Sequence, residues 1–293
     1  MATINDWLEG ARVRTLPASL APVIIGAGVA VDEGGFSLPR TLLAAVVALA
    51  FQIGVNFSND YSDGVRGTDD FRTGPPRLTG GGKASPKLVL KLALAFFALG
   101  ALAGFVLVAL SGKWWILAVG AASILAAWFY TGGKNPYGYM GLGEVFVMVF
   151  FGWVATVGTV YLQTGTAPAT AWISGTGVGF IACALLMVNN IRDIPTDKLT
   201  GKRTLAVRMG DRAARYSFVV LLVLPLVLLF ALVVLGRPWT LLPLVLALLV
   251  GPISRSVLGG AKGRELIPAL KYTGLYELSY GVLLCAGFVI GTL

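Results

Sequence analysis

Aspartates and asparagines recur in two polar stretches whose side chains could bind a cation and a phosphate. Residues 56–77 read NFSNDYSDGVRGTDDFRTGPPR and directly follow an uncharged run at 41–55. Residues 188–210 read VNNIRDIPTDKLTGKRTLAVRMG and follow a second apolar segment. Acidic groups at the edge of a membrane segment are costly and indicate a functional site, unless they simply end a helix in a polar loop. Because the composition and the position both repeat, we favour the functional interpretation.

The acidic and amide side chains are spaced four residues apart, which places pairs of them on one face of a helix. The pairs are Asn56 with Asp60, Asn59 with Asp63, Asn189 with Asp193, and Asp193 with Asp197. Pro195 removes a backbone donor and crowds the preceding turn. We therefore expect the second helix to kink or end near Ile194 and to leave Asp197 on the turn beyond it.

The donors in these stretches are all oxygen atoms, which suits a hard cation such as Mg²⁺. Proteins commonly hold Mg²⁺ with one or two carboxylates together with phosphate oxygens of the substrate. Basic side chains nearby could grip the same phosphate oxygens, arginine at two points and lysine as a point charge. These residues are Arg66, Arg72, Arg77, Lys83, Lys202 and Arg203. Together with the apolar segments, they predict a substrate with a diphosphate head and an apolar tail.

An ion-coupled transporter is the alternative function. Intramembrane carboxylates also relay protons or sodium ions, and repeated halves are common in transporters. Transporter repeats often break their helices near the bilayer midplane, whereas both acidic stretches here follow the end of an apolar segment. That location favours an enzyme that acts on a lipid diphosphate.

The composition indicates a polytopic membrane protein. Of the 293 residues, 56% are hydrophobic and 13% are charged, against about a quarter charged in soluble domains. We expect nine spanning segments, at 16–30, 42–59, 88–110, 114–130, 145–162, 172–188, 216–235, 239–253 and 275–290. The predicted fold is an all-α membrane protein with one domain over 1–293. Segments one to four and five to eight would form two similar halves, and the ninth helix would be added to them.

The distribution of basic residues predicts the orientation. Arg40, Lys113 and Arg237 fall on one side of the nine segments, and the other 20 of the 23 lysines and arginines fall on the side of the N-terminus. The N-terminus and both acidic stretches should therefore face the cytoplasm. This asymmetry explains the net charge of +9 through contact with the lipid bilayer and indicates no nucleic-acid partner. The chain has no histidine, which excludes imidazole ligands and a histidine base.

The motifs NDYSD at 59–63 and DIPTD at 193–197 resemble the two aspartate-rich motifs of the UbiA superfamily of intramembrane aromatic prenyltransferases. Within it, ARVRTLPASLAPVIIG, NDYSDGVRGTDDFRTGPPRL, YTGGKNPYGYMGLGEV and NNIRDIPTDKLTGKRTLAVRMG are similar to the branch that prenylates 1,4-dihydroxy-2-naphthoate in menaquinone biosynthesis. The continuation after the first motif differs from 4-hydroxybenzoate prenyltransferases, whose acceptor is the alternative. Gly67 stands where relatives have a further aspartate, and Asp69 could substitute from two positions on.

The resemblance implies helices around a central cavity that opens laterally to lipid. It implies magnesium-dependent transfer of a polyprenyl chain from a polyprenyl diphosphate to 1,4-dihydroxy-2-naphthoate, with loss of carbon dioxide, at the cytoplasmic membrane of a bacterium. The metal ligands and catalytic residues that we expect are Asn59, Asp60, Asp63, Asp193 and Asp197, with Asn56, Asn190 and Arg203 contacting the substrate.

The glycine-rich loop at 130–145 carries three further candidates. Tyr139 could stabilise an allylic cation with its aromatic face, or it could be an interfacial anchor. Lys134 could meet the carboxylate of the acceptor, or it could be one more cytoplasmic charge. Glu144 could orient or deprotonate a ring hydroxyl, or it could be an acidic residue favoured at a helix N-terminus.

Overall fold

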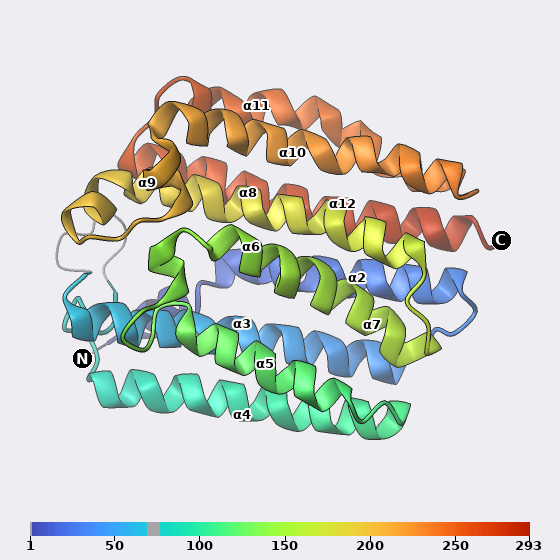
Figure 1. Cartoon of the computed structure of the whole chain (residues 1–293), viewed down its shortest axis with the longest axis horizontal. Helices are drawn as coiled ribbons and strands as arrows, with labels where there is room; N and C mark the ends of the chain where they lie inside the picture. The colour runs from blue at the N-terminus through green and yellow to red at the C-terminus, as the bar shows by residue number, and fades with distance from the viewer. Residues whose placement is uncertain (1, 69–76) are drawn as a thin grey trace.

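The computed structural model describes residues 2–68 and 77–293, and every regular element in those ranges is helical. The helices run roughly along one direction as a bundle (Figure 1). In chain order the longer elements are α1 Ile4–Ala11, α2 Leu16–Asp32, α3 Leu38–Arg66, α4 Pro86–Ser111, α5 Ile116–Phe129, α7 Ala155–Thr164, α8 Ala169–Leu199, α10 Asp211–Val234, α11 Ala247–Leu258 and α12 Ile267–Ile290. Shorter elements join them: η1 Val13–Thr15, η2 Tyr137–Met140, α6 Gly143–Val147, η3 Met148–Val154, α9 Leu205–Met209, η4 Pro238–Leu246 and η5 Gly263–Leu266.

Each of the nine apolar segments predicted from the sequence falls on helical structure. Seven helices in the described ranges are long and apolar enough to cross a membrane. An eighth span is possible if α1 and α2, which are bent by 47° relative to each other, count as one. The α5 helix is apolar but has only 14 residues. The prediction of an all-helical membrane protein is thus confirmed, with seven or eight spans by length.

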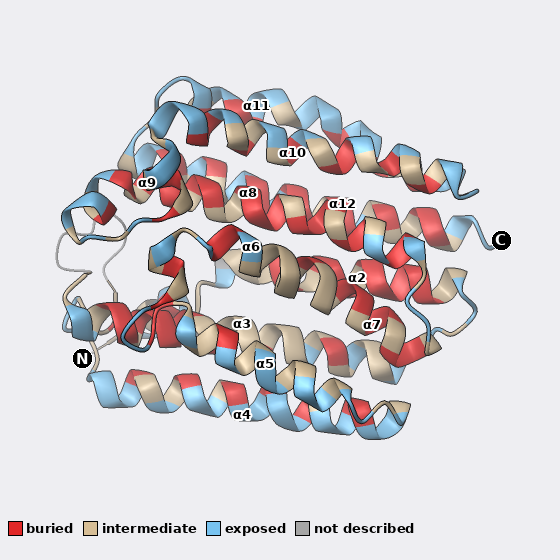
Figure 2. Cartoon of the chain, viewed as in Figure 1, coloured by how far each residue is buried: buried red, intermediate tan, exposed pale blue. Residues whose placement is uncertain are grey.

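The core of the bundle lies along α2, α8 and α12, where buried residues concentrate (Figure 2). The outer helices α4, α10 and α11 expose one face (Figure 2). Many of the exposed side chains on these helices are leucine, valine or phenylalanine, such as Leu102, Val227 and Leu248. An apolar outer surface around a core that contains buried polar groups is expected for a bundle that is solvated by lipid.

The prediction that α8 would kink or end near Ile194 is wrong as to the helix end, because α8 continues through Pro195 to Leu199. Asp197 therefore lies within the helix and is buried there. The hydroxyl of Thr196 donates to the carbonyl of Asp193 at 2.9 Å. This bond lies within the same turn and does not reach the carbonyl of Ile191, which lacks its helical donor because Pro195 has no N–H.

The segment from α6 to α7 contains a π-helical stretch, η3, that packs closely on α8. A Cβ added at Gly152 would lie 2.7 Å from the carbonyl oxygen of Gly175 and 3.0 Å from the Cα of Gly179. Small residues allow such close backbone approach between membrane helices. The glycines therefore fix how η3 sits on α8, and Val147 and Phe151 from this segment line the cavity described below.

The three basic residues predicted on the side opposite the N-terminus all make structural contacts. Arg40 donates to the carbonyls of Leu162, Gln163 and Leu110, which end α7 and α4. The ammonium of Lys113 lies 5.5 Å from the ring centroid of Tyr161. Arg237 forms an ion pair with Asp32 at 2.7 Å. These contacts explain why basic residues occur on that side despite the strong bias toward the other.

Candidate active site

The C-terminal ends of α3 and α8 come together at the same end of the bundle, through the side chain of Asp63. Its Oδ1 accepts a hydrogen bond from the hydroxyl of Tyr139 at 2.6 Å, and its Oδ2 forms an ion pair with Lys202 at 3.2 Å. The Lys202 ammonium also lies 4.5 Å from the centroid of the Tyr139 ring. The loop after α8 thus closes on the first acidic motif, as the repetition of the motifs predicted.

Tyr139 is positioned as a hydrogen-bond donor. Its backbone carbonyl accepts from the backbone N–H of Arg203 at 2.9 Å, which ties η2 to the loop after α8. Burial, together with the Asp63 carboxylate, raises the pKa of Tyr139 above its ordinary value. The phenol therefore stays protonated at neutral pH and can donate to Asp63 throughout that range.

The second acidic motif lies on the last turns of α8. Asp193 is paired with Arg192 through two hydrogen bonds, of 2.7 Å from Nε and 2.6 Å from the terminal nitrogen. Arg192 is buried, and two-point pairs between an arginine and a carboxylate are among the stronger charged hydrogen bonds. Asp197 is buried one turn further on.

The asparagines of the two motifs hold neighbouring segments in place. The Oδ1 of Asn59 accepts from the hydroxyl of Thr131 at 2.8 Å. The Nδ2 of Asn56 donates to the carbonyl of Ala11 at 2.9 Å, at the end of α1. The Nδ2 of Asn190 donates to Glu144 at 3.2 Å, and both residues are buried. The loop at 130–145 is thereby joined to both motifs.

A cavity of about 540 Å³ lies between the two motifs. Its apolar wall includes Val147, Phe151, Leu185, Leu186 and Leu270. Its polar and charged lining consists of Asn5, Glu9, Arg12, Thr15, Gln52, Asp60, Arg77, Asn189, Arg192 and Lys271. The cavity therefore joins a strongly basic region to an apolar one, as the predicted substrate requires.

Of the predicted site residues that the structure describes, Asp60 and Arg77 line this cavity, and the others, including Asp63 and Asp193, lie outside its lining. Arg66 donates to the carbonyl of Gly133 and its guanidinium lies 5.5 Å from the Tyr139 ring centroid. Lys134 and the side chain of Arg203 are exposed. Two further candidates, Asp69 and Arg72, fall outside the described residues.

Both oxygens of Asp60 accept from backbone N–H groups, whereas the carboxylate of Asp63 pairs with the side chains of Tyr139 and Lys202. Oδ2 accepts from Leu78 at 2.9 Å and Oδ1 accepts from Thr79 at 2.8 Å. The side chain is fully buried. The structure thus places Asp60 beside the cavity with both oxygens bound to the chain itself.

The donor set fits Mg²⁺ by its chemistry. Within the described ranges, no three histidine, cysteine, aspartate or glutamate side chains form a ready-made metal site. The nearby donors are nevertheless all oxygens. Asp63 and Asp193 each already hold a cationic side chain, from Lys202 and Arg192 respectively. Carboxylates that form ion pairs with cationic side chains can also bind a hard metal cation.

The sequence reasoning missed three basic residues of the cavity: Arg12, Arg192 and Lys271. Arg12 has a left-handed backbone conformation, with φ of 52°, at the break between α1 and α2. Arg192 lies inside the second motif, next to Asp193. Arg12 and Arg192 each lie within one of the quoted motifs, and that position was the available signal. Both residues had been counted only among the basic charges of the cytoplasmic side.

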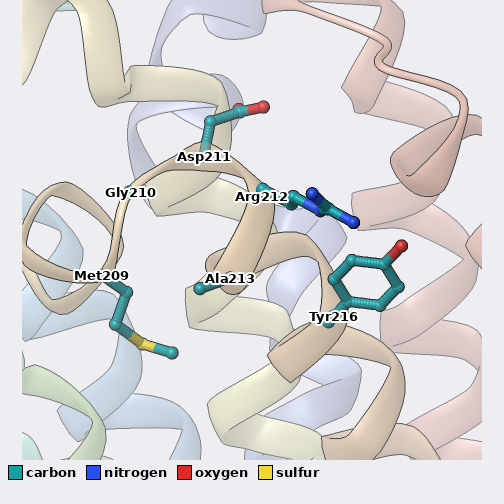
Figure 3. Close-up of a pocket in the computed structure, with 6 residues that line it drawn as sticks. All are labelled: Met209, Gly210, Asp211, Arg212, Ala213 and Tyr216. Carbon is teal, nitrogen blue, oxygen red and sulfur yellow. The ribbon is translucent and has the colours of Figure 1, made fainter.

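A second recess, of about 480 Å³, lies at the junction of α9 and α10 (Figure 3). It is lined by Met209, Gly210, Asp211, Arg212, Ala213 and Tyr216. Asp211 is paired with Arg215 at 2.8 Å, and the Arg212 guanidinium lies 5.9 Å from the Tyr216 ring centroid. None of the residues expected to take part in the chemistry lines this recess.

Comparison with known proteins identifies the relatives of this chain. The model of the UbiA prenyltransferase family matches residues 19–264. A 1,4-dihydroxy-2-naphthoate octaprenyltransferase of Mycobacterium tuberculosis is 47% identical over 293 residues, which cover 100% of both chains. Proteins of the same name are 40% identical over 71% of this chain and 70% of theirs in Escherichia coli, and 30% identical over 95% and 90% in Bacillus subtilis.

Solved structures share the fold at low sequence identity. The structure of a UbiA homolog from Aeropyrum pernix K1, in its apo form, aligns with a TM-score of 0.68 at 16% identity, over 95% of this chain and 98% of the other. A UbiA homolog from Archaeoglobus fulgidus, bound to GPP and Mg²⁺, aligns with a TM-score of 0.63 at 15% identity, over 96% and 99%.

Proposed function

Because the chain belongs to the UbiA prenyltransferase family, we propose that it transfers a polyprenyl chain from a polyprenyl diphosphate to 1,4-dihydroxy-2-naphthoate. Carbon dioxide leaves from the ring, and the product is demethylmenaquinol, in menaquinone biosynthesis. The acceptor follows from the relatives, one of which carries that substrate in its name and is 47% identical over its full length.

One structural observation supports the proposal: a single cavity joins a basic region to an apolar wall. Arg12, Arg77 and Arg192 supply positive charge at its lining. A diphosphate carries several negative charges and is recognised best by such groups. The apolar wall, with Phe151 and Leu185, suits the prenyl tail.

The reaction breaks the allylic C–O bond, so negative charge grows on the diphosphate while positive charge grows on the allylic carbon. Arginine side chains already in place stabilise the first charge where it develops. Phe151 offers an aromatic face to the second charge. The apolar wall excludes water, which would otherwise capture the cation, and the electron-rich ring then forms the new C–C bond.

Mg²⁺ would be held by Asn59 and Asp63 from α3 and by Asp193 and Asp197 from α8. When bound, it would neutralise charge on the diphosphate and favour its departure. The structure of the Archaeoglobus fulgidus homolog with GPP and Mg²⁺ supports this choice of metal. Lys202 and Arg192 pair with two of these carboxylates in the structure, and their positive charge would also favour a diphosphate beside them.

The acceptor would lie near Glu144 and Asn190. Glu144 is buried, and its Oε2 has no hydrogen-bond partner among the described residues. A buried carboxyl with one unsatisfied oxygen can accept a hydrogen bond from a ring hydroxyl. Asn190 holds the other oxygen, so the carboxyl is oriented before the acceptor arrives.

For the membrane arrangement, the proposal is nine spans in two similar halves with a ninth helix, with the N-terminus and the site at the cytoplasmic face. Nine spans result if α5 and the bent α1–α2 pair each count as one. The two motifs end helices of similar length, with 29 residues in α3 and 31 in α8. The basic residues at the other face all have structural contacts, which supports the orientation.

The purified protein, incubated with octaprenyl diphosphate, Mg²⁺ and 1,4-dihydroxy-2-naphthoate, should release diphosphate and form a decarboxylated prenyl naphthoquinol of the expected mass. The control replaces the acceptor with 4-hydroxybenzoate. Product with hydroxybenzoate alone would contradict the acceptor. Ion flux in liposomes without a prenyl donor, together with no product from either acceptor, would favour a transporter instead.

A further inference from the structure

Asp60 binds the backbone of a turn, whereas the other aspartate of the first motif binds side chains. The oxygens of Asp60 accept from the N–H groups of Leu78 and Thr79, which lie 18 and 19 positions further along the chain. Asp63 instead accepts from the side chains of Tyr139 and Lys202. The amides of Leu78 and Thr79 belong to the main chain of the turn, so they cannot swing away as a side chain can.

The first residue that Asp60 holds, Leu78, is packed into the protein, and Thr79 beside it is half-buried. Leu78 is 1% exposed and Asp60 is fully buried. Buried backbone N–H groups need a partner, because leaving them unsatisfied is costly. If Asp60 were to turn both oxygens to a metal, the amides of Leu78 and Thr79 would lose the partner that the structure gives them.

The same turn supports the helix that borders the cavity. A Cβ added at Gly10 of α1 would lie 2.5 Å from Cδ1 of Leu78 and 3.1 Å from the Phe57 ring, so α1 rests directly on Leu78. Asp6 of α1 is paired with Lys83, just beyond the turn. The α1 residues Asn5, Leu8 and Glu9 line the cavity, and so does Arg77, which directly precedes Leu78.

We propose that Asp60 is a positioning residue that holds the Leu78–Thr79 turn, and does not ligate the metal. Through this turn it fixes Arg77 in the cavity wall and α1 beside it. This inference rests on the proposed function for the identity of the ligand, a prenyl diphosphate with Mg²⁺. It divides the first motif into a metal-binding part, Asn59 and Asp63, and a part that builds the cavity wall.

Hydrogen exchange of the protein in detergent, without metal or substrate, tests the structural half of the proposal. Asp60→Ala should speed exchange in the segment 78–84 by roughly tenfold or more, since exchange reports local opening of hydrogen-bonded backbone. Asp60→Asn should give an intermediate effect, because the amide retains only one accepting oxygen. The matched control, Asp63→Ala, should leave this segment within about twofold of the parent.

Binding of Mn²⁺ in the presence of inorganic diphosphate, followed by electron paramagnetic resonance, tests the metal half. Asp63→Ala should weaken Mn²⁺ binding by roughly tenfold or more, and Asp60→Asn should keep it within about threefold. The proposal is overturned if Asp60→Asn weakens Mn²⁺ as much as Asp63→Ala does. It is also overturned if exchange of 78–84 is unchanged in both Asp60 variants.

The two sets of results separate this inference from the proposed function. If the parent protein forms no prenylated product, the proposed function fails, while exchange at 78–84 still decides the role of Asp60. If Asp60→Ala does not give monodisperse protein, hydrogen exchange and Mn²⁺ binding of Asp60→Asn alone decide the role of Asp60, because this variant preserves the volume of the side chain.

Discussion

The hydroxyl of Tyr139 donates to Asp63 across 2.6 Å, although 76 positions separate the two residues in the chain. This hydrogen bond joins η2 to the end of α3, and Lys202 adds the loop after α8 to the same carboxylate. Three segments that are distant in sequence therefore converge on one acidic group. Two partners orient the Asp63 carboxylate before a ligand binds, which reduces the entropic cost of binding.

Replacement of Tyr139 by phenylalanine should lower turnover about tenfold, the scale of losing one hydrogen bond to a charged group. Because burial raises the pKa of Tyr139, the hydroxyl is protonated throughout the working range. The ratio of parent to variant turnover should therefore be equal at about pH 6.5 and about pH 9. A ratio that falls toward one as the pH rises would show that the phenol loses its proton, and would contradict this role.

Alanine at Asp63, Asp193 or Asp197 should each lower turnover by about a hundredfold or more, the scale of losing one strong transition-state contact. Asp63→Ala and Asp193→Ala also remove the ion pairs with Lys202 and Arg192, so the folding of each variant is checked separately. Turnover at saturating substrates and Mg²⁺ gives the measurement, with monodispersity in detergent as the control for folding. Full activity in the double variant Asp63→Ala with Asp193→Ala would contradict the assignment of these aspartates to catalysis.

The helices and the proximity of the two motifs could be predicted from the sequence, because both depend on patterns along the chain. Apolar segments of about 20 residues predict spanning helices wherever they occur. The even number of segments between the motifs predicted one shared face, and Lys202 does pair with Asp63. The predicted end of α8 near Ile194 was wrong, because α8 continues to Leu199. A proline breaks an isolated helix, but a helix packed among others in a membrane protein can continue through it.

Partner choice within the site could not be read from the sequence. Asp60 and Asp63 are equivalent by composition, yet one binds a backbone turn and the other binds Tyr139 and Lys202. The difference arises from where residues 78–79 return to α3, which no local pattern encodes. In the same way, Lys134 was prominent in its loop but lies outside the cavity lining, whereas Lys271 belongs to it.

The orientation in the membrane can be tested with single cysteines in a variant that lacks Cys183 and Cys285. Cysteines at Glu33 and Thr166, both exposed at the end opposite the motifs, should react with an impermeant maleimide in sealed cells. Cysteines at Lys198 and Lys262, both exposed near the motifs, should react only after permeabilisation. Labelling of Lys198→Cys in sealed cells would contradict a cytoplasmic site.

Gly152→Ala should lower the stability of the bundle, because the added methyl group would meet the backbone of Gly175 and Gly179 on α8. Overpacking of this kind costs about 1–3 kcal/mol. Gly158→Ala on the adjoining α7 is the matched control, since nothing lies within 4 Å of its added Cβ. The control should be neutral or stabilising by up to about 1 kcal/mol. Thermal unfolding in detergent measures both, and equal midpoints would contradict the close packing.

The carboxylate of the acceptor needs a positive contact, and two lysines are candidates for it. Both side chains are exposed, but Lys271 lines the cavity beside Leu270, whereas Lys134 lies outside its lining. A lysine that borders the cavity can act directly on a charged ligand inside it, because the attraction between two charges falls with distance. Lys271 is therefore the better placed of the two.

We expect Lys271→Ala to raise the KM for 1,4-dihydroxy-2-naphthoate roughly tenfold while changing kcat little, the signature of losing binding that substrate and transition state share. Lys134→Ala should change the same KM less than about twofold, and it serves as the matched control because it removes the same charge from an exposed residue outside the cavity lining. The KM for the prenyl diphosphate distinguishes the roles of Lys271. If that KM rises as much as the acceptor KM, Lys271 serves the diphosphate; if only Lys134→Ala affects the acceptor, the loop at 130–145 must close over the ring during turnover.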